Sequence, residues 1–241
     1  ARLLEFLNAR MPLGAPAPAG GLLILFAISG ARDAVRFLSR LGRETREEIS
    51  QWTFFDRALL GLCGVVLALS VLYAFAPPLD YDDLEYHLGG PKTYFLSGKI
   101  HFIPGNVYTN FPAGMEMVNY FFMALANSPM QGAVLGKLVN TGLLVMTMVR
   151  IGGWIALRLG RGWAVVGAAF FLTTPWTARL AMVCYTEPGQ AFFSLLALFA
   201  FFRAVVPEDT GERLSPARWL ALAGISAGLA VSCKYTALLF L

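Results

Sequence analysis

Long apolar stretches separated by shorter polar connections dominate the pattern along this chain. Residues 11–30 and 58–76 carry no charge, and the runs at 131–149, 162–178, 189–206 and 219–241 are interrupted by one charged side chain at most. About 18 apolar residues, rising 1.5 Å each in a helix, reach across the ~30 Å hydrocarbon core of a bilayer. The pattern therefore predicts an all-α, polytopic transmembrane bundle of six spans, the first weakened by its prolines.

Composition supports this class. Hydrophobic residues make up 57% of the 241 residues and charged ones 14%, against about 25% charged in ordinary soluble domains. The net charge of +4 could suggest nucleic acid, but the basic residues lie between the spans and not on one face, so we exclude that partner. The three cysteines have no redox or metal spacing and are interpreted as packing residues. Because the chain begins at Ala1 and ends at Leu241 inside an apolar run, we expect a missing C-terminal half or protein partners.

Basic residues predict which side each connection faces. The 31–57 connection holds six arginines and the 150–161 connection holds three, so both are expected to be cytoplasmic. The loop at 77–130 should then face outward, and its apolar segment 113–126 is too short to cross. Glu116 and Asn119 give that segment a polar side, which favours an interfacial or re-entrant helix. We divide the chain into an N-terminal segment, 1–54, and a transmembrane module, 55–241.

The densest polar cluster follows the second predicted span. Asp82, Asp83, Glu85 and His87 lie within six residues, and in a helix Asp83 and His87 share a face while Asp82 lies beside Tyr86. A carboxylate held at a membrane surface can act as a general base. A Gly-Gly-Pro break and Lys92 follow. Two other interpretations stay open: a simple hydrated loop, or a divalent cation bound by Asp83, His87 and His101.

Two further polar residues stand beside later spans. Glu187 precedes Pro188, a residue suited to the first turn of a helix, so its carboxylate is placed at a helix N-terminus, where it is either catalytic or a cap. Lys234 lies about 24 Å along a helix from Arg218, on the same predicted side as Asp82, and could bind a lipid-linked phosphate or extend to the headgroups. Lys137 and Arg203 are interpreted as snorkelling residues.

This order of features resembles the GT-C membrane glycosyltransferases, among them protein O-mannosyltransferases and the transferases that modify lipid A with aminoarabinose. Asp82-Asp83 stands where their first outer loop begins with Asp, and the stretch Tyr81 to Leu88 is similar to an "Asp, two residues, Tyr-His-Leu" form. Glu187 in Thr-Glu-Pro stands where many have Asp, and Cys-Lys234-Tyr resembles their Thr-Lys. Asn110-Phe111-Pro112 replaces Glu-Lys-Pro, which removes a metal ligand. The resemblance covers residues 55–241.

The resemblance implies an inverting transfer of a sugar from a polyprenyl-phosphate donor, at the periplasmic face of a bacterial inner membrane. Asp82 would be the base, with Asp83 as its acidic neighbour, and Glu187 would position the acceptor or the base. The substrate-binding residues would be Lys234, His87, Tyr86 and Lys92. A divalent cation is an optional cofactor. The alternatives are a non-catalytic subunit of a larger complex and a transporter, although a transporter usually carries its charges inside the spans.

Overall fold

The computed structural model describes residues 52–206 and 215–240. The chain forms two compact units, residues 1–58 and 59–241. In the first unit, described from residue 52, the helix α3 (Phe54–Ala74) begins at a reciprocal cap. The Thr53 hydroxyl donates to Asp56 Oδ2 at 2.7 Å, and the Asp56 N–H donates back to Thr53 Oγ1 at 3.2 Å. Such caps satisfy backbone donors that a helix start leaves unpaired.

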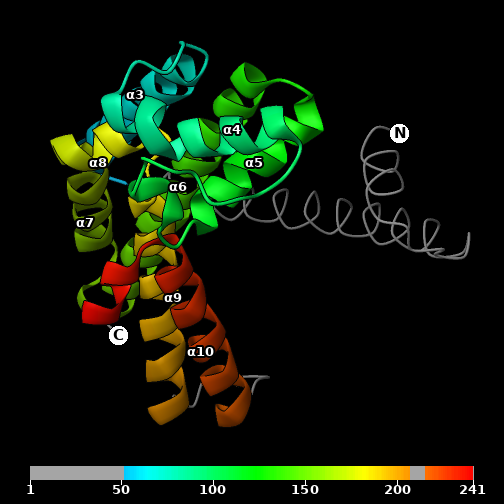
Figure 1. The fold of residues 1–241 in the computed structure, drawn as a ribbon. Coiled ribbons are helices and arrows are strands. Elements are labelled where there is room, and N and C mark those ends of the chain that lie inside the picture. The colour runs from blue at the N-terminus through cyan, green and yellow to red at the C-terminus, as the bar shows by residue number, and fades with distance from the viewer. Residues whose placement is uncertain (1–51, 207–214, 241) are drawn as a thin grey trace, which may run out of the picture. The chain divides into compact units, whose positions relative to one another are not determined.

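In the second unit the described residues are helical and include no strand. After α3 come the short turn η1 (Asp83–His87), α4 (Gly89–Ser97), η2 (Tyr108–Asn110) and α5 (Gly114–Ala126). The longer helices follow: α6 (Pro129–Leu159), α7 (Arg161–Thr173), α8 (Pro175–Leu180), α9 (Glu187–Val205), α10 (Pro216–Cys233) and η3 (Tyr235–Leu239). Figure 1 shows α9 and α10 side by side, as their many shared contacts require.

Four helices are long and apolar enough to span a membrane, α3, α6, α9 and α10, as expected of an integral membrane protein. Of the six predicted spans, 11–30 lies outside the described residues. The run 162–178 is interrupted, because Pro175 starts a new helix and α7 keeps only 13 residues, about 20 Å. The last span is also shorter than predicted, because α10 ends at Cys233. Conversely, α6 continues through most of the predicted 150–161 connection.

Small residues let α6 pack closely against α5. A Cβ added at Gly132 would lie 2.5 Å from the Met123 side chain, and one at Gly136 would lie 2.2 Å from Asn119 Oδ1. Close approach through small residues is typical of helices in membranes. The segment 113–126 is a 13-residue helix as predicted, but its polar side faces inward: Glu116 and Asn119 are both buried. Its polar residues therefore belong to the interior of the unit and not to a water-facing side.

Candidate active site

The acidic turn after α3 is tied to a distant segment by one buried carboxylate. Residues 83–87 form a π-helical turn, closed by the Leu88 N–H donating to the Asp83 carbonyl at 2.8 Å. Asp83 is 1% exposed, and its Oδ1 accepts the Cys184 N–H at 2.9 Å. Burial raises the pKa of Asp83 to about 6, although the Cys184 hydrogen bond opposes this. Asp83 therefore joins two segments that are a hundred residues apart.

His87, on the same turn, pairs with a carboxylate of α5. Its Nδ1 lies 2.7 Å from Glu116 Oε1, and both residues are buried. The amide of Asn119, one helical turn further on, donates to the His87 carbonyl at 3.2 Å. The inward polar side of α5 thus holds the histidine in place. Asp83 and His87 both point into the unit, which is the shared face that their spacing predicts.

The segment between α8 and α9 carries the partner of Asp83 and is held by α6. Asn140 Nδ2 donates to the carbonyls of Val183 at 2.8 Å and Tyr185 at 2.9 Å, and Thr141 Oγ1 donates to the Ala181 carbonyl at 2.8 Å. Side chains thereby satisfy the buried carbonyls of a non-helical segment. This rigid support places residues 181–186 beside the acidic turn.

Asp80 binds that assembly from outside the turn. It accepts a hydrogen bond from the Tyr185 hydroxyl at 2.5 Å and forms an ion pair with Arg179. The pKa of Tyr185 is raised, first by burial and then by its bond to Asp80. The pKa of Tyr86 is also raised, first by burial and then by the charge and hydrogen bond of Asp82. Asp82 also contributes to the raised pKa of Tyr185, after burial and Asp80, so it lies close to both Tyr86 and Tyr185.

Glu187 and Lys234 meet as an ion pair. Glu187 is the first residue of α9, and Lys234 follows directly after α10, where the backbone turns extended with φ −158°. Their Oε1 and Nζ atoms are 2.7 Å apart. Because α9 and α10 pack along their length, these two helix ends coincide. Lys234 is therefore not inside a span but at the end of one.

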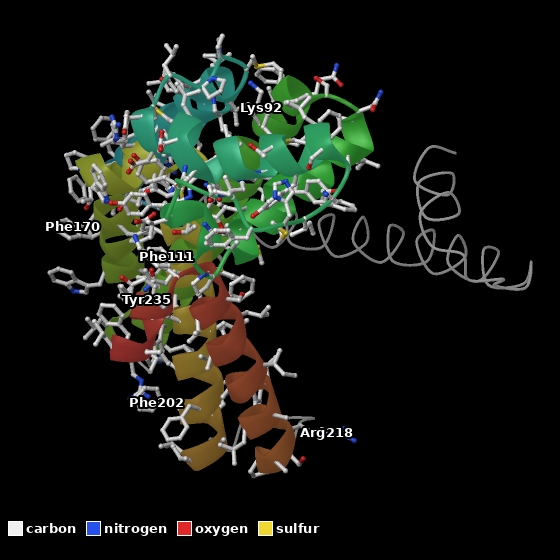
Figure 2. All side chains as sticks on the ribbon, in the orientation of Figure 1. Lys92, Phe111, Phe170, Phe202, Arg218 and Tyr235 are labelled. Carbon is white, nitrogen blue, oxygen red and sulfur yellow. The ribbon has the colours of Figure 1, made fainter. Side chains whose placement is uncertain are left out.

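A small pocket of about 180 Å³ is lined by residues of both pairs, the His87–Glu116 pair and the Glu187–Lys234 pair, of which Lys234 contributes to the lining. His87 and Glu116 line one part of it and Lys234 another, and its other lining residues are Tyr86, Tyr108, Phe111, Pro112, Thr186, Cys233 and Tyr235. Successive ring centroids of Tyr86, Tyr108, Phe111 and Tyr235 are 5.1, 6.1 and 5.6 Å apart. In Figure 2 Phe111 and Tyr235 lie near each other, well away from Arg218 at the other end of α10.

The predicted site residues divide into three groups. His87, Tyr86 and Lys234 line the pocket, and Glu187 is bound to Lys234. Asp82 and Asp83 adjoin the lining turn without lining the pocket. Lys92 is exposed on α4 and lies apart from Phe111 and Tyr235 (Figure 2). Sequence reasoning missed Glu116 as a site residue, although its place on the polar side of an amphipathic segment was the available signal.

Lys137 is buried, which corrects one interpretation from the sequence. It is 1% exposed, and its Nζ donates to the Ala76 carbonyl at 2.8 Å, just beyond the last turn of α3. A snorkelling lysine would extend to the headgroups, whereas this one lies within the unit and caps the end of a helix. The three cysteines are buried and free, as expected for packing residues.

The described residues contain no group of three or more histidine, cysteine, aspartate or glutamate side chains placed to hold a metal ion. His101, one of the three predicted ligands, instead places its Nδ1 2.8 Å from the Phe102 carbonyl and its ring against Tyr94. Asp83 and His87 are occupied by Cys184 and Glu116. The trio predicted from the sequence is therefore not assembled in this structure.

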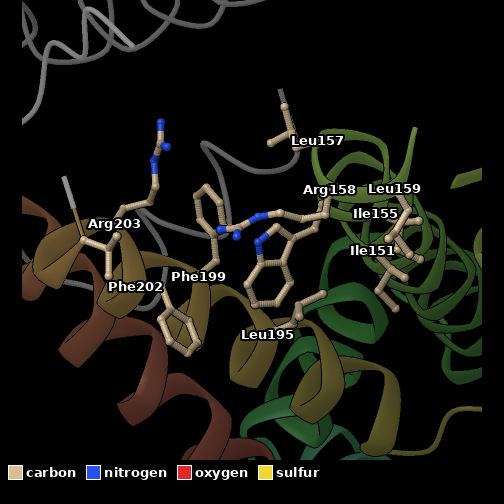
Figure 3. Close-up of a pocket in the computed structure, with 11 residues that line it drawn as sticks. Ile151, Ile155, Leu157, Arg158, Leu159, Leu195, Phe199, Phe202 and Arg203 are labelled. Carbon is tan, nitrogen blue, oxygen red and sulfur yellow. The ribbon is translucent and has the colours of Figure 1, made fainter. Parts of the chain in front are cut away.

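A larger pocket of about 530 Å³ lies between the C-terminal parts of α6 and α9 (Figure 3). Apart from two arginines its lining is apolar: Ile151, Trp154, Ile155, Leu157, Arg158, Leu159, Leu195, Phe199, Phe202, Arg203 and Val206. The Arg150 guanidinium lies 3.3 Å from the Phe199 ring centroid. Among the described residues no carboxylate or histidine lines it, so this described lining offers no group that could exchange a proton near neutral pH.

The fold and its membrane-length helices thus describe an all-helical integral membrane protein with a polar, aromatic-lined site at the ends of α9 and α10. Comparison with models of known protein families, with curated proteins and with solved structures found no match. The GT-C resemblance therefore stays a prediction.

Proposed function

We propose that this chain belongs to a membrane glycosyltransferase that transfers a sugar from a polyprenyl-phosphate donor to an acceptor at the outer, periplasmic surface of a bacterial inner membrane. The observation that carries the proposal is the Lys234–Glu187 pair beside a small pocket, next to an acidic turn. One cation and several carboxylates meet where two membrane-length helices end. A donor with its phosphate at a membrane surface and its tail in the lipid matches that position.

Lys234 is the phosphate-binding residue in this proposal. Its ammonium lies 2.7 Å from Glu187 Oε1, and its side chain is 40% exposed. A phosphate reaching the pocket can therefore bind to Lys234 without displacing a buried group. Charge-assisted hydrogen bonds of this kind are stronger than neutral ones. They matter most as the phosphate departs and gains negative charge.

Asp82 is the proposed general base. The acceptor hydroxyl oxygen attacks the anomeric carbon while Asp82 takes its proton. The bond between that carbon and the phosphate oxygen breaks, and its electron pair leaves with the polyprenyl phosphate. Asp83 is less suited to this step, because it is 1% exposed and already accepts the Cys184 N–H. Its role is to position the turn that carries Asp82, and Glu187 positions Lys234.

Two short helices would guide the lipid. α4 and α5 are too short to cross a bilayer, and they present exposed apolar side chains such as Leu96 and Phe121. Short helices that expose apolar side chains can lie against the bilayer in the plane of the interface. Placed there, they would border the route by which the polyprenyl chain reaches the pocket.

The test is Asp82→Asn in the full-length protein, assayed in membranes for transfer from a polyprenyl-phosphate sugar. Loss of a general base costs roughly 100- to 10,000-fold in rate, so we expect a fall of about 100-fold or more. Glu85→Gln is the matched control, because Glu85 is exposed on the same turn and bonds only to the Asn106 side chain in the described structure. Unchanged transfer by Asp82→Asn would exclude the proposed base.

A further inference from the structure

Two carboxylate oxygens lack a hydrogen-bond partner among the described residues, one on Glu116, which lines the small pocket, and one on Glu187, which pairs with the lining Lys234 but does not itself line the pocket. These are Glu116 Oε2 and Glu187 Oε2, both shielded from solvent. The other oxygen of each carboxylate is occupied, Glu116 Oε1 by His87 and Glu187 Oε1 by Lys234. A buried charged acceptor without a donor is costly. Because Glu116 lines the pocket, its Oε2 is suited to a hydrogen-bond donor that a ligand brings.

The remaining lining is aromatic. Tyr86, Tyr108, Phe111 and Tyr235 border the pocket, and Tyr86 and Tyr108 stack with their ring planes 29° apart. A few polar groups among aromatic walls are typical of small-molecule sites. A pyranose ring offers what these walls and Glu116 Oε2 need, since its C–H faces pack against aromatic rings and its hydroxyls donate hydrogen bonds. The volume of about 180 Å³ is below the ~300–1,000 Å³ of drug-sized sites and fits one sugar ring.

Charge restricts which sugar can enter. The described lining holds one lysine, Lys234, which Glu187 already pairs, together with the Glu116 carboxylate, and Asp82 lies beside Tyr86. Burial raises the pKa of Tyr86 most, and the carboxylates of Asp82, Glu187 and Glu116 raise it further, so all three act on its hydroxyl. Lys234 is paired with Glu187 in the free protein and would be engaged by the donor phosphate in the complex, so in either state a further carboxylate on the sugar would meet uncompensated negative charge. Hydroxyl groups meet no such repulsion.

We propose that this pocket binds the donor's sugar as a single neutral ring and rejects uronic acids, with Glu116 Oε2 accepting one of its hydroxyl hydrogen bonds. This rests on the proposed function and adds the class of sugar to it. Glu116 is then a specificity-determining residue, held in place by His87.

The experiment measures binding without transfer, on the full-length protein in lipid nanodiscs free of sugar detergents. Saturation-transfer NMR compares the methyl glycosides of glucose and galactose with those of glucuronic and galacturonic acid, pairs that differ only at carbon 6. We expect at least one neutral glycoside to bind about tenfold or more tightly than its acid partner. Equal binding within both pairs, or binding of neither member, would overturn the proposal. This comparison needs no variant.

Glu116→Gln tests the residue itself. The amide oxygen can still pair with His87, while the negative charge is lost, so the helix and turn should be retained. We expect the neutral glycoside to bind roughly tenfold more weakly, the scale of a lost hydrogen bond to a charged group, and its advantage over the acid to fall below about threefold. Glu85→Gln, outside the pocket, should change neither. Unchanged selectivity in a folded Glu116→Gln protein would overturn the role of Glu116.

Failure here can be told from failure of the transferase proposal. If Asp82→Asn abolishes transfer but neutral and acidic glycosides bind alike, the sugar class is wrong and the transferase stands. If neutral glycosides bind selectively but Asp82→Asn transfers normally, the assigned base is wrong and the sugar site stands.

Discussion

Two pockets of the second unit, the ones described above, both adjoin α9, but they differ in the kind of group that lines them. The larger, about 530 Å³, has aliphatic and aromatic walls with Arg158 and Arg203. The smaller, about 180 Å³, gathers His87, Glu116 and Lys234, each hydrogen-bonded to a side chain from another element. Volume therefore does not locate the chemistry. Both pockets hold cationic side chains, but in the described lining only the smaller one adds a carboxylate and a histidine, where non-helical segments meet the helix ends.

The two pockets also differ in the contacts that hold their walls in place. Around the smaller pocket, side chains of α5 and α6 hold backbone carbonyls of the turn and of residues 181–186. Beside the larger one, the guanidinium groups of Arg150 and Arg203 lie over the ring of Phe199. Directional hydrogen bonds position groups more strictly than apolar packing does. The comparison predicts that substitutions near the smaller pocket will change the rate of transfer and the free energy of unfolding more than substitutions near the larger one.

Among substitutions that compare the two pockets, the largest effect should come from replacing one cation at each pocket by methionine. Lys234→Met removes the proposed phosphate contact, and a lost hydrogen bond to a charged group costs about 1.5–3 kcal/mol, or roughly 10- to 100-fold in transfer. Arg158→Met, in the larger pocket, should change transfer less than about twofold. Both are measured as initial rates in membranes at matched protein levels. Equal losses in the two variants would remove the distinction between the pockets.

The second effect concerns the support of residues 181–186. Asn140→Ala leaves the buried carbonyls of Val183 and Tyr185 without their donor, and we expect a loss of about 2–4 kcal/mol in the free energy of unfolding. The matched control is Thr147→Ala on the same helix, since Thr147 donates only to the Leu143 carbonyl one turn away. Thermal unfolding of the purified proteins compares them. A control as destabilised as Asn140→Ala would argue against a special support.

A smaller effect concerns the pH dependence of the free energy of unfolding. The pKa of Asp83 is raised by burial to about 6 from 3.8, so the folded state favours the protonated carboxyl. The stability this gives is complete below pH 4 and is lost as pH rises through 6. Relative to Asp83→Asn, wild type should lose about 2 kcal/mol between pH 4 and pH 7, on the scale of 1.36 kcal/mol per pKa unit. Parallel unfolding curves for the two proteins would contradict the raised pKa.

The smallest effect is expected at Lys92. Its chemistry equals that of Lys234, but it is exposed on α4 and does not line the pocket. Lys92→Met should therefore change transfer less than about twofold, measured beside Lys234→Met. A loss comparable with that of Lys234→Met would show that Lys92 does bind substrate, although it lies outside the lining of the pocket.

The sequence predicted a helix well where neighbouring residues mark its extent, as an apolar run or a proline near its first turn does. Apolar runs indicated α3, α6, α9 and α10, and Pro188 marked the start of α9. The run 162–178 was misjudged, because hydropathy is insensitive to one proline, yet Pro175 ends α7 and begins α8. Lys234 was likewise placed in a continuing span, although α10 ends one residue before it.

By itself the sequence determined the class of protein, because apolar length and charge spacing are properties of consecutive residues, and it determined that Asp82, Asp83 and His87 share a short turn. Only the tertiary structure decided which aspartate is buried, that Glu116 reaches His87 over 29 residues, and that Lys234 reaches Glu187 over 47. Those pairings depend on how α5, α9 and α10 pack. Packing is set by contacts between helices, which the spacing of residues within each helix does not contain.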